Sequence, residues 1–403
     1  MTTHPTVADV VAALEVRYPP RWADEGDAIG LIVGDPAASV EHVLFAVDPV
    51  QQVVDEAITS KADLIVVHHP LLFRAVNTVA ADRPKGKVIH DLISHGIALY
   101  VAHTNADSPP DGVSESMAHA LGLGDLRPLV PDPADPLDKL VTFVPNADAQ
   151  RVIDALTEAG AGAIGDYDRC AFLAQGEGTF RPGPAANPTL GSTGEIEVVA
   201  ETRLEMVLSR GRRDQVVAAL RSAHPYEEPA FDVVELAEWA GDRGSGRVGT
   251  LEQPMTLRGF ADAVAAALPA TAVGARVSGD LDRQVENVAL AGGAGDFLLD
   301  DARLAGVDVF VTSDLRHHPA SEFREYDGPA LIDVPHWAAE WTWLPVIQRV
   351  LTGDLAADGR EVRSTVSRIC TDPWNYRASS TASSPEPLDR PPPPLTPGVH
   401  PES

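Results

Sequence analysis

The sequence predicts an α/β fold: a discontinuous, two-halved domain with a mixed or parallel sheet and helices on both faces, plus an inserted ferredoxin-like α+β domain. In residues 40–107, apolar runs of strand length alternate with amphipathic segments, and this β-α-β-α-β order is typical of parallel strands joined by right-handed crossovers. A similar order returns in residues 285–341. Between the halves, residues 138–250 have the strand–helix–strand–strand–helix–strand order of a ferredoxin-like unit.

Composition and charge narrow the class of protein. The chain has 403 residues, 44% of them hydrophobic and 22% charged, which predicts a soluble globular protein of two or three domains. A net charge of −28 repels phosphate backbones and anionic lipid surfaces, so we expect neither nucleic acid nor membrane as a partner. Two cysteines, Cys170 and Cys370, make no disulfide framework, and the N-terminal residues lack the apolar stretch of a signal peptide. We therefore expect a cytoplasmic protein.

Residues 1–137 are expected to form the first half of the two-halved domain. A helix is predicted over residues 6–17, where apolar residues recur at helical spacing. The glycines of residues 26–35 predict a tight turn into a strand, because a phosphate-binding loop would need a Lys-Ser/Thr ending. The other predicted elements are strands over 40–49, 63–69 and 98–107 and helices over 53–62 and 85–97.

The inserted domain is expected in residues 138–250, after a Pro/Asp-rich linker over 131–138. Its predicted strands cover 140–145, 170–180, 195–209 and 230–236, and its predicted helices cover 149–160 and 212–223. The glycine-rich residues 241–251 are interpreted as a flexible linker that leads back to the first domain.

Residues 251–372 are expected to form the second half of the two-halved domain. Strands are predicted over 285–295 and 307–315, a helix over 297–306, and a strand running into a helix over 330–341. The similarity of this pattern to the first half suggests an ancient duplication. Residues 373–403 are expected to be a disordered tail, since 377–403 are rich in Ser and Pro with almost no apolar content.

Two adjacent histidines end the most apolar predicted strand. Leu64 to Val67 read as a strand buried on both faces, His68 and His69 follow, and Pro70 cannot continue the ladder. A surface pair in a loop is the simpler interpretation of two such histidines. However, ligands in open α/β sheets bind just past the carboxyl ends of the strands, and a neutral imidazole is a common metal ligand.

Two further segments supply matching groups. Asp107 ends the segment His-Thr-Asn-Ala-Asp, in which His103 and Asn105 can orient it. His336 and Glu340 are four residues apart at the start of a predicted helix, so both side chains lie on one helical face. Three imidazoles and two carboxylates suffice for two divalent ions that share a bridging carboxylate. No thiolate is among them, so Zn, Mn, Fe, Co and Ni all remain possible.

These segments resemble the three signatures of a known family. The stretches VVHHPLLF (66–73), AHTNAD (102–107) and DVPHWAAE (333–340) are similar to those of the Nif-three-like family, also called GTP cyclohydrolase 1 type 2 homologs or dinuclear metal centre proteins. The segment AHPYEEPAFDVVEL (223–236) resembles part of the inserted CutA/PII-like domain of the longer members. The resemblance covers about residues 5–370. It departs from the family at Gly26–Leu31, where a Trp and an Asn are missing, at Thr312-Ser313-Asp314, and at Pro335, where a Gly is usual.

The resemblance implies a site, an assembly and an activity. It places metal ligands at His68, His69, Asp107, His336 and Glu340 and implies a ring-like homo-oligomer, a homohexamer, with the sites facing an internal cavity. The implied activity is that of a dinuclear metal-dependent hydrolase, in which metal-activated water attacks a nucleotide such as GTP or a related small molecule, while His103 or His318 moves protons. The alternative is a non-enzymatic, metal-dependent oligomeric regulator or partner-binding protein.

Overall fold

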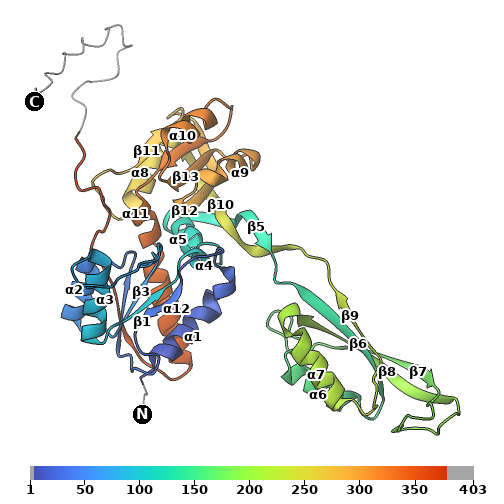
Figure 1. Ribbon diagram of the computed structural model, residues 1–403. Coiled ribbons are helices and arrows are strands. Elements are labelled where there is room, and N and C mark those ends of the chain that lie inside the picture. The colour runs from blue at the N-terminus through green and yellow to red at the C-terminus, as the bar shows by residue number, and fades with distance from the viewer. Residues whose placement is uncertain (1–3, 379–403) are drawn as a thin grey trace, which may run out of the picture.

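The first of three sheets has five strands and is mostly parallel. The computed structural model describes residues 4–378 (Figure 1). In the order β1-β4-β3-β2-β15, the strands are β1 (Gly30–Val33), β4 (Ala98–Val101), β3 (Leu64–Val67), β2 (His42–Ala46) and β15 (Arg363–Val366). Only β1 runs antiparallel to its neighbour. The parallel arrangement predicted for residues 40–107 is therefore confirmed.

Helices cover both faces of this sheet, as predicted, because its central strands are apolar on both faces. Helices α2 (Gln51–Ser60) and α3 (Pro84–His95) pack on the side to which Leu44 and Ile65 point. Helices α1 (Val7–Arg17) and α12 (Leu344–Ala357) pack on the side of Val43 and Phe45. The chain thus returns to the first sheet at its end through α12 and β15, which the sequence pattern did not predict.

The second sheet has six strands of mixed direction. In the order β11-β14-β13-β12-β10-β5, they are β11 (Arg276–Ser278), β14 (Ala330–Asp333), β13 (Val309–Ser313), β12 (Gln284–Ala294), β10 (Ala240–Thr256) and β5 (Leu123–Pro133). Strands β12, β13 and β14 are parallel. Helices α5 (Val113–Ala120) and α8 (Leu257–Ala267) lie on the inner side, and α9 (Leu299–Leu304) and α10 (His317–Phe323) on the outer side. One hydrophobic core joins this sheet to the first, and the two together form the main body.

Both segments expected to be linkers are largely strand. Residues 131–133 end β5, and residues 241–251 lie within β10, where Gly244 pairs with Pro131 and Val248 with Arg127. The prediction of a flexible linker over 241–251 was wrong, because glycines in this segment allow β10 to pack closely against β5. A Cβ on Gly244 would lie 2.2 Å from the carbonyl oxygen of Val130.

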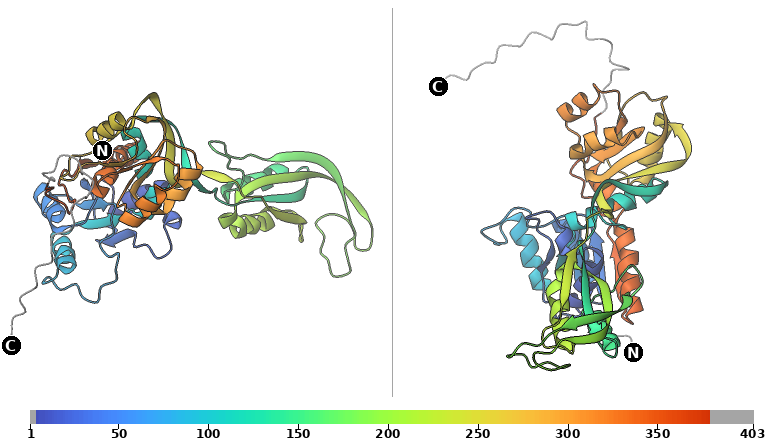
Figure 2. Two further views of the ribbon diagram at one scale, coloured as in Figure 1. Left: turned by 90° about the horizontal axis from the view of Figure 1, so that it is seen from above. Right: turned by 90° about the vertical axis from the view of Figure 1, so that its right-hand side faces the viewer.

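The third sheet belongs to a unit between β5 and β10, here called the insert unit (residues 137–235). Its antiparallel strands, in the order β7-β8-β6-β9, are β7 (Phe172–Phe180), β8 (Glu197–Ser209), β6 (Leu137–Pro145) and β9 (Phe231–Glu235). Helices α6 (Ala149–Glu158) and α7 (Arg213–Ala223) cover one face around a core of their own. Figures 1 and 2 show the unit projecting from the main body on the paired strands β5 and β10.

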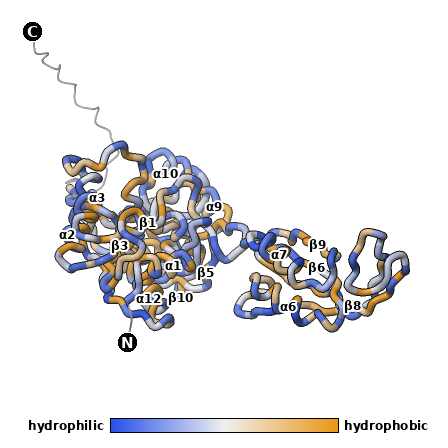
Figure 3. The backbone as a smooth tube through the Cα atoms, turned by 60° about the horizontal axis from the view of Figure 1, so that its bottom comes forward, coloured by the Kyte–Doolittle hydropathy of each residue, from blue (hydrophilic) through white to orange (hydrophobic). Residues whose placement is uncertain are grey.

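Hydropathy follows this arrangement. In Figure 3 the hydrophobic stretches gather inside the main body, while many connecting loops are hydrophilic. None of the helices in residues 4–378 is long and apolar enough to cross a bilayer. Of the tail expected over 373–403, residues 379–403 lie outside the described residues, whereas Pro373 and Trp374 line a cavity next to His336.

Candidate metal centre

The histidine pair lies where the main body's two sheets meet. Strand β3 ends at Val67, and the backbone N–H groups of His68 and His69 both donate to the Val47 carbonyl, which turns the chain out of the sheet. His68 is 1% exposed, and its Nδ1 lies 2.9 Å from the Ala102 carbonyl oxygen. Nδ1 of His69 lies 2.7 Å from Oδ1 of Asp48, a residue just past β2. A neutral imidazole held in this way donates from Nδ1 and keeps the lone pair of Nε2 free.

The segment that carries Asp107 is a helical turn. A strand was predicted over 98–107, but β4 ends at Val101 and α4 (Thr104–Asp107) follows. The Asn105 side chain stabilises this turn, because its Oδ1 accepts from the His103 N–H while its Nδ2 donates to the Tyr18 carbonyl. Nδ1 of His103 lies 3.0 Å from both oxygens of Asp27, so this imidazole is also held by a carboxylate.

The third segment is α11 (His336–Trp341), which follows β14. The predicted pairing on one helical face is confirmed, since Nε2 of His336 lies 2.6 Å from Oε1 of Glu340. Glu340 is 3% exposed. Nδ1 of His336 lies 2.8 Å from Oδ2 of Asp314, which follows β13.

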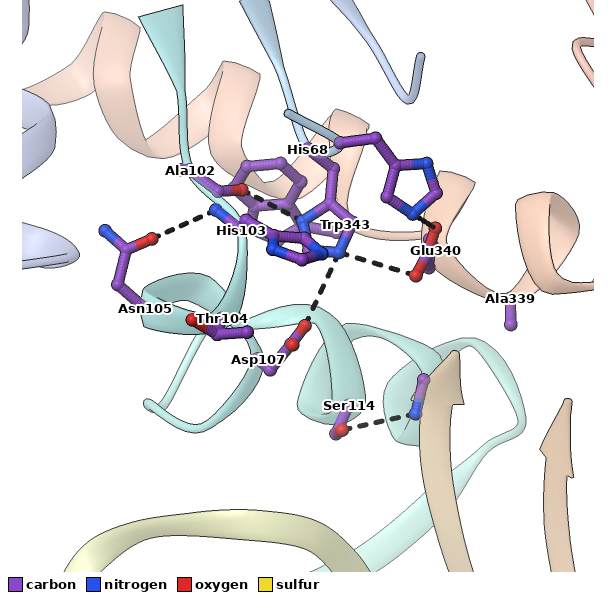
Figure 4. Close-up of polar contacts among 12 residues, drawn as sticks. His68, Ala102, His103, Thr104, Asn105, Asp107, Ser114, Ala339, Glu340 and Trp343 are labelled. Atoms are coloured by element: carbon purple, nitrogen blue, oxygen red, sulfur yellow. Dashed lines mark hydrogen bonds and ion pairs between the residues drawn. The ribbon is translucent and has the colours of Figure 1, made fainter. Parts of the chain in front are cut away.

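The three segments converge on Glu340 (Figure 4). Nε2 of His68 lies 3.4 Å from Oε1 of Glu340 and 3.5 Å from Oδ1 of Asp107. Nε2 of His69 lies 3.0 Å from Oε2 of Glu340. The five residues expected to be metal ligands therefore lie together. Two groups within them and His103 have potential ligand atoms all within 4.8 Å of one another: His68, His69 and His103, and His69, His336 and Glu340.

Burial and the shared carboxylate together set the charges of these groups. Burial lowers the pKa of these histidines, but Glu340 and the orienting carboxylates together outweigh it. With Asp48 the pKa of His69 rises to about 11, and with Asp314 that of His336 rises to about 10. Burial favours a protonated Glu340, yet the surrounding imidazoles, His69 first, hold its pKa well below the usual value. Burial raises the pKa of Asp107 to about 6. Burial and the nearby His68 lower the pKa of His103.

The donor set fits divalent cations. Oδ1 of Asp107 and Oε2 of Glu340 are buried and have no hydrogen-bond partner among the described residues, although 36% of the Asp107 side chain remains exposed. Buried carboxylate oxygens without hydrogens to accept are costly unless a cation is nearby. Gly293, at the end of β12, keeps the space open: its φ is 91°, and a Cβ there would lie 2.8 Å from Oε1 of Glu340.

Of the two histidines expected to move protons, His103 lies at the cluster and His318 does not. The His103 ring lies beside those of His68 and His69, with centroid distances of 5.2 and 5.8 Å. His318 is exposed on α10, where its ring packs edge-on against His317, and it belongs to neither close group of ligand atoms. Sequence reasoning missed the three orienting carboxylates, Asp27, Asp48 and Asp314. The sequence signal for Asp48 and Asp314 was their position near the ends of the apolar segments predicted as strands, 40–49 and 307–315.

A cavity of about 650 Å³ opens beside the cluster. His69 and His336 form part of its wall, and Arg276, Trp337 and Trp374 also line it. This volume lies within the range of small-molecule sites. The segment after β15 forms one side, where the Thr371 hydroxyl donates a hydrogen bond to Asp48.

Comparison with known proteins gives consistent matches along nearly the whole chain. The sequence profile of the Duf34/NIF3 (NGG1p interacting factor 3) family matches residues 5–373. A protein of Mycobacterium tuberculosis named GTP cyclohydrolase 1 type 2 homolog is 48% identical over 370 residues, which cover 92% of this chain and 96% of that protein. A Bacillus subtilis protein of the same name is 38% identical, with 91% and 98% covered. The crystal structure of a Bacillus cereus protein related to NIF3 matches with a TM-score of 0.80 at 37% identity, covering 93% of this chain and all of that one.

Proposed function

The chain belongs to the Duf34/NIF3 family, and on that premise we propose that it is a dinuclear metal-dependent hydrolase. The observation that carries the proposal is the shared geometry of the histidines. Each of His68, His69, His103 and His336 holds Nδ1 against an oxygen acceptor, which leaves Nε2 available beside the buried Glu340 and the partly exposed Asp107. Such orientation by outer acceptors is typical of metal-binding imidazoles.

In this proposal two divalent ions are held by His68, His69, Asp107, His336 and Glu340. When bound, such a pair supplies Lewis-acid activation of water at neutral pH. Asp48 and Asp314 fix the ring orientations of His69 and His336. His103 serves as the proton acceptor, because its lowered pKa keeps it neutral at pH 7 and Asp27 fixes its ring.

The substrate is proposed to be a small molecule that enters the cavity beside His69 and His336. Relatives that are named GTP cyclohydrolase 1 type 2 homologs make GTP and related nucleotides the first compounds to test. Trp374 offers an aromatic face to such a substrate, and Arg276, whose guanidinium also pairs with Asp333, offers a positive charge. A cytoplasmic location remains part of the proposal, since both cysteines are free thiols.

Metal content decides the first part of the proposal. We expect mass spectrometry to find about two ions per chain in the purified protein and none in the His68→Ala/His336→Ala double variant. The matched control is His317→Ala/His318→Ala, which removes two exposed histidines of α10 and should leave the metal content unchanged. Turnover of nucleotides, phosphoesters and cyclic amides would then be measured with the metal found. No metal after reconstitution would refute the dinuclear centre.

The alternative function, a metal-dependent oligomeric regulator or partner-binding protein, is favoured by one feature of the insert unit. This unit stands away from the main body. Ile196 and Val198, two residues apart at the start of β8, are 63% and 64% exposed. Exposed apolar residues that cluster are typical of protein interfaces. Metal-loaded protein that binds a partner or assembles, yet turns over none of the tested compounds, would support this alternative. A ring-like homo-oligomer, such as a homohexamer, is compatible with either function.

We also propose that the insert unit is a ferredoxin-like domain of the CutA/PII-like type. Its β-α-β-β-α-β order and its sheet order, β7-β8-β6-β9, support this proposal. The division proposed from the sequence is residues 1–137, 138–250, 251–372 and 373–403. We place the end of the insert near residue 236, because residues 240–256 pair with β5 and β12 in the main body.

A further inference from the structure

A second cavity of about 650 Å³ lies in the insert unit, apart from the metal centre. Helices α6 and α7 cover one face of the four-stranded sheet, and the cavity lies on the other. Its walls are mainly apolar: Phe143 from β6, Phe180 from β7, and Pro182, Pro188 and Leu190 from the segment that joins β7 to β8. Apolar walls with a few convergent polar groups are typical of small-molecule sites.

The segment that joins β7 to β8 (residues 181–196) covers the cavity as a roof, and hydrogen bonds hold it in place. Residues 181–196 leave β7 and arch back over the open face of the sheet, and two hydrogen bonds tie their middle to the segment before β9. The Asn187 N–H donates to Oε2 of Glu227 at 3.0 Å, and the Thr189 hydroxyl donates to the Pro225 carbonyl at 2.6 Å. The roof is therefore held off the sheet, and the space beneath it is enclosed on several sides.

Two glycines of β7, Gly176 and Gly178, leave space for the cavity and for the Glu201 side chain. No heavy atom lies within 4 Å of a Cβ built on Gly176, so that position faces empty space. A Cβ on Gly178 would lie 2.0 Å from Oε2 of Glu201. Glu201, which is 8% exposed, thus extends its carboxylate across the strand where a side chain is missing.

The polar groups in the cavity are mostly anionic or aromatic. Oε1 of Glu201 accepts from the Tyr226 hydroxyl at 2.7 Å, while Oε2 has no hydrogen-bond partner among the described residues. The Phe180 and Tyr226 rings lie side by side, with centroids 5.7 Å apart. Arg203 is the one cation in the lining, and its Nε donates to Glu205 at 2.7 Å instead of to Glu201.

We propose that this cavity binds an organic cation, a primary ammonium group attached to an apolar body. The ammonium would lie against the free oxygen of Glu201 and the faces of Phe180 and Tyr226, where charge pairing and cation–π attraction act together. The apolar body would fill the space between Phe143 and Leu190. An anionic ligand would face Glu201, Glu227 and Glu228, against which Arg203, whose guanidinium lies 5.7 Å from the Phe143 ring centroid, is the one opposite charge in the lining, so its binding is disfavoured.

Calorimetric titration of the full chain tests the proposal with phenethylammonium as the probe and two matched compounds, 2-phenylethanol and 3-phenylpropionate. We expect phenethylammonium to bind at least about tenfold more tightly than the alcohol, a difference of about 1.4 kcal/mol, and the anion not to bind. Glu201→Gln should remove most of this preference, and Gly176→Leu should remove binding by filling the cavity. Glu158→Gln, an exposed change on α6, is the control and should bind like the unchanged protein.

The outcomes are separable from those at the metal centre. Metal content and circular dichroism of each variant show whether the chain is folded, and Tyr226→Phe, which keeps the ring, offers a milder variant that should retain binding. Equal binding of amine and alcohol, or unchanged amine binding in Glu201→Gln, would overturn the proposal. So would complete absence of amine binding to the folded protein.

Discussion

At the residue scale, Glu340 organises the candidate site. It is buried, it contacts three imidazoles, and its charge contributes to the raised pKa values of all three. A single carboxylate among several imidazoles is a stable arrangement only while protons or metal ions supply the opposite charge. Protons and metal ions must therefore compete for the same nitrogens.

This competition predicts proton release on metal binding. His69, with a pKa of about 11, and His336, with a pKa of about 10, both carry a proton at pH 7.5, and both must lose it to bind a metal. Metal affinity should therefore rise with pH up to about pH 11 and fall on acidification. Calorimetry in buffers of different ionisation enthalpy should give at least about two protons released per chain, since the pKa of the third ligand histidine, His68, is raised as well. Histidines with an ordinary pKa of about 6.5 would release almost none, and that result would contradict the raised values.

Gly293→Ala tests the space around Glu340. The new Cβ would lie 2.8 Å from Oε1 of Glu340, in a backbone conformation with φ of 91° that alanine tolerates poorly. We expect at least about tenfold weaker metal binding together with a loss of about 1 kcal/mol in stability. Gly306→Ala is the matched control, because its φ is also positive but no heavy atom lies within 4 Å of the added Cβ. Equal metal affinity in both variants would show that Gly293 has no role at the site.

The residues of the site differed in how far the sequence could predict them. His68, His69, His336 and Glu340 were predictable because adjacency and helical spacing place them together locally. The orienting carboxylates Asp27, Asp48 and Asp314 were not, since each meets its histidine through the fold and carries no spacing signal.

At the element scale, the paired strands β5 and β10 connect the insert unit to the main body. Their anchor is Arg247, whose side chain is fully buried. It pairs with Glu115 at 2.9 Å and donates to the carbonyls of Gly244, Gly246, Ser108 and Pro109. One side chain thus ties β10 to α5 and to the turn that follows α4.

Replacing this anchor should destabilise the main body. In Arg247→Met, the charge of Glu115 and four buried carbonyls lose their partner, and we expect a loss of about 3–5 kcal/mol in the free energy of unfolding. Arg127→Met, an exposed change on β5, should stay within about 0.5 kcal/mol of the unchanged protein. Urea unfolding followed by tryptophan fluorescence measures both. Similar midpoints for the two variants would mean that Arg247 is not an anchor.

The elements also show where sequence patterns stop being informative. Strand β3 was predictable because four consecutive apolar residues are buried on both faces. Strand β10 was not predictable. Its glycines interrupt the alternation of apolar and polar residues that marks a strand, and its partner β5 is more than a hundred residues away along the chain. Strand β15 and helix α12 return to the first sheet through contacts with residues far away in the sequence, which local hydrophobic periodicity does not predict.

At the scale of the whole molecule, the candidate site joins two sheets while the insert unit stands apart. His68 and His69 come from the first sheet, whereas His336 and Glu340 follow β14 of the second. The insert unit has a hydrophobic core separate from that of the main body. The pattern of alternating strands and helices predicted both halves, but it could not show that they form two sheets with the site between them.

Metal ions should therefore stabilise the main body and leave the insert unit unchanged. We expect calorimetry of the metal-free chain to show two unfolding transitions, because the two cores share no residues. Added metal binds only the folded site, so at a hundred times its Kd it stabilises the main body by about 2.7 kcal/mol and raises only that transition. In His68→Ala/His336→Ala, neither transition should move. A single transition that shifts as a whole would show that β5 and β10 couple the insert unit to the site, and hydrogen exchange would then locate protection by metal within β6 to β9.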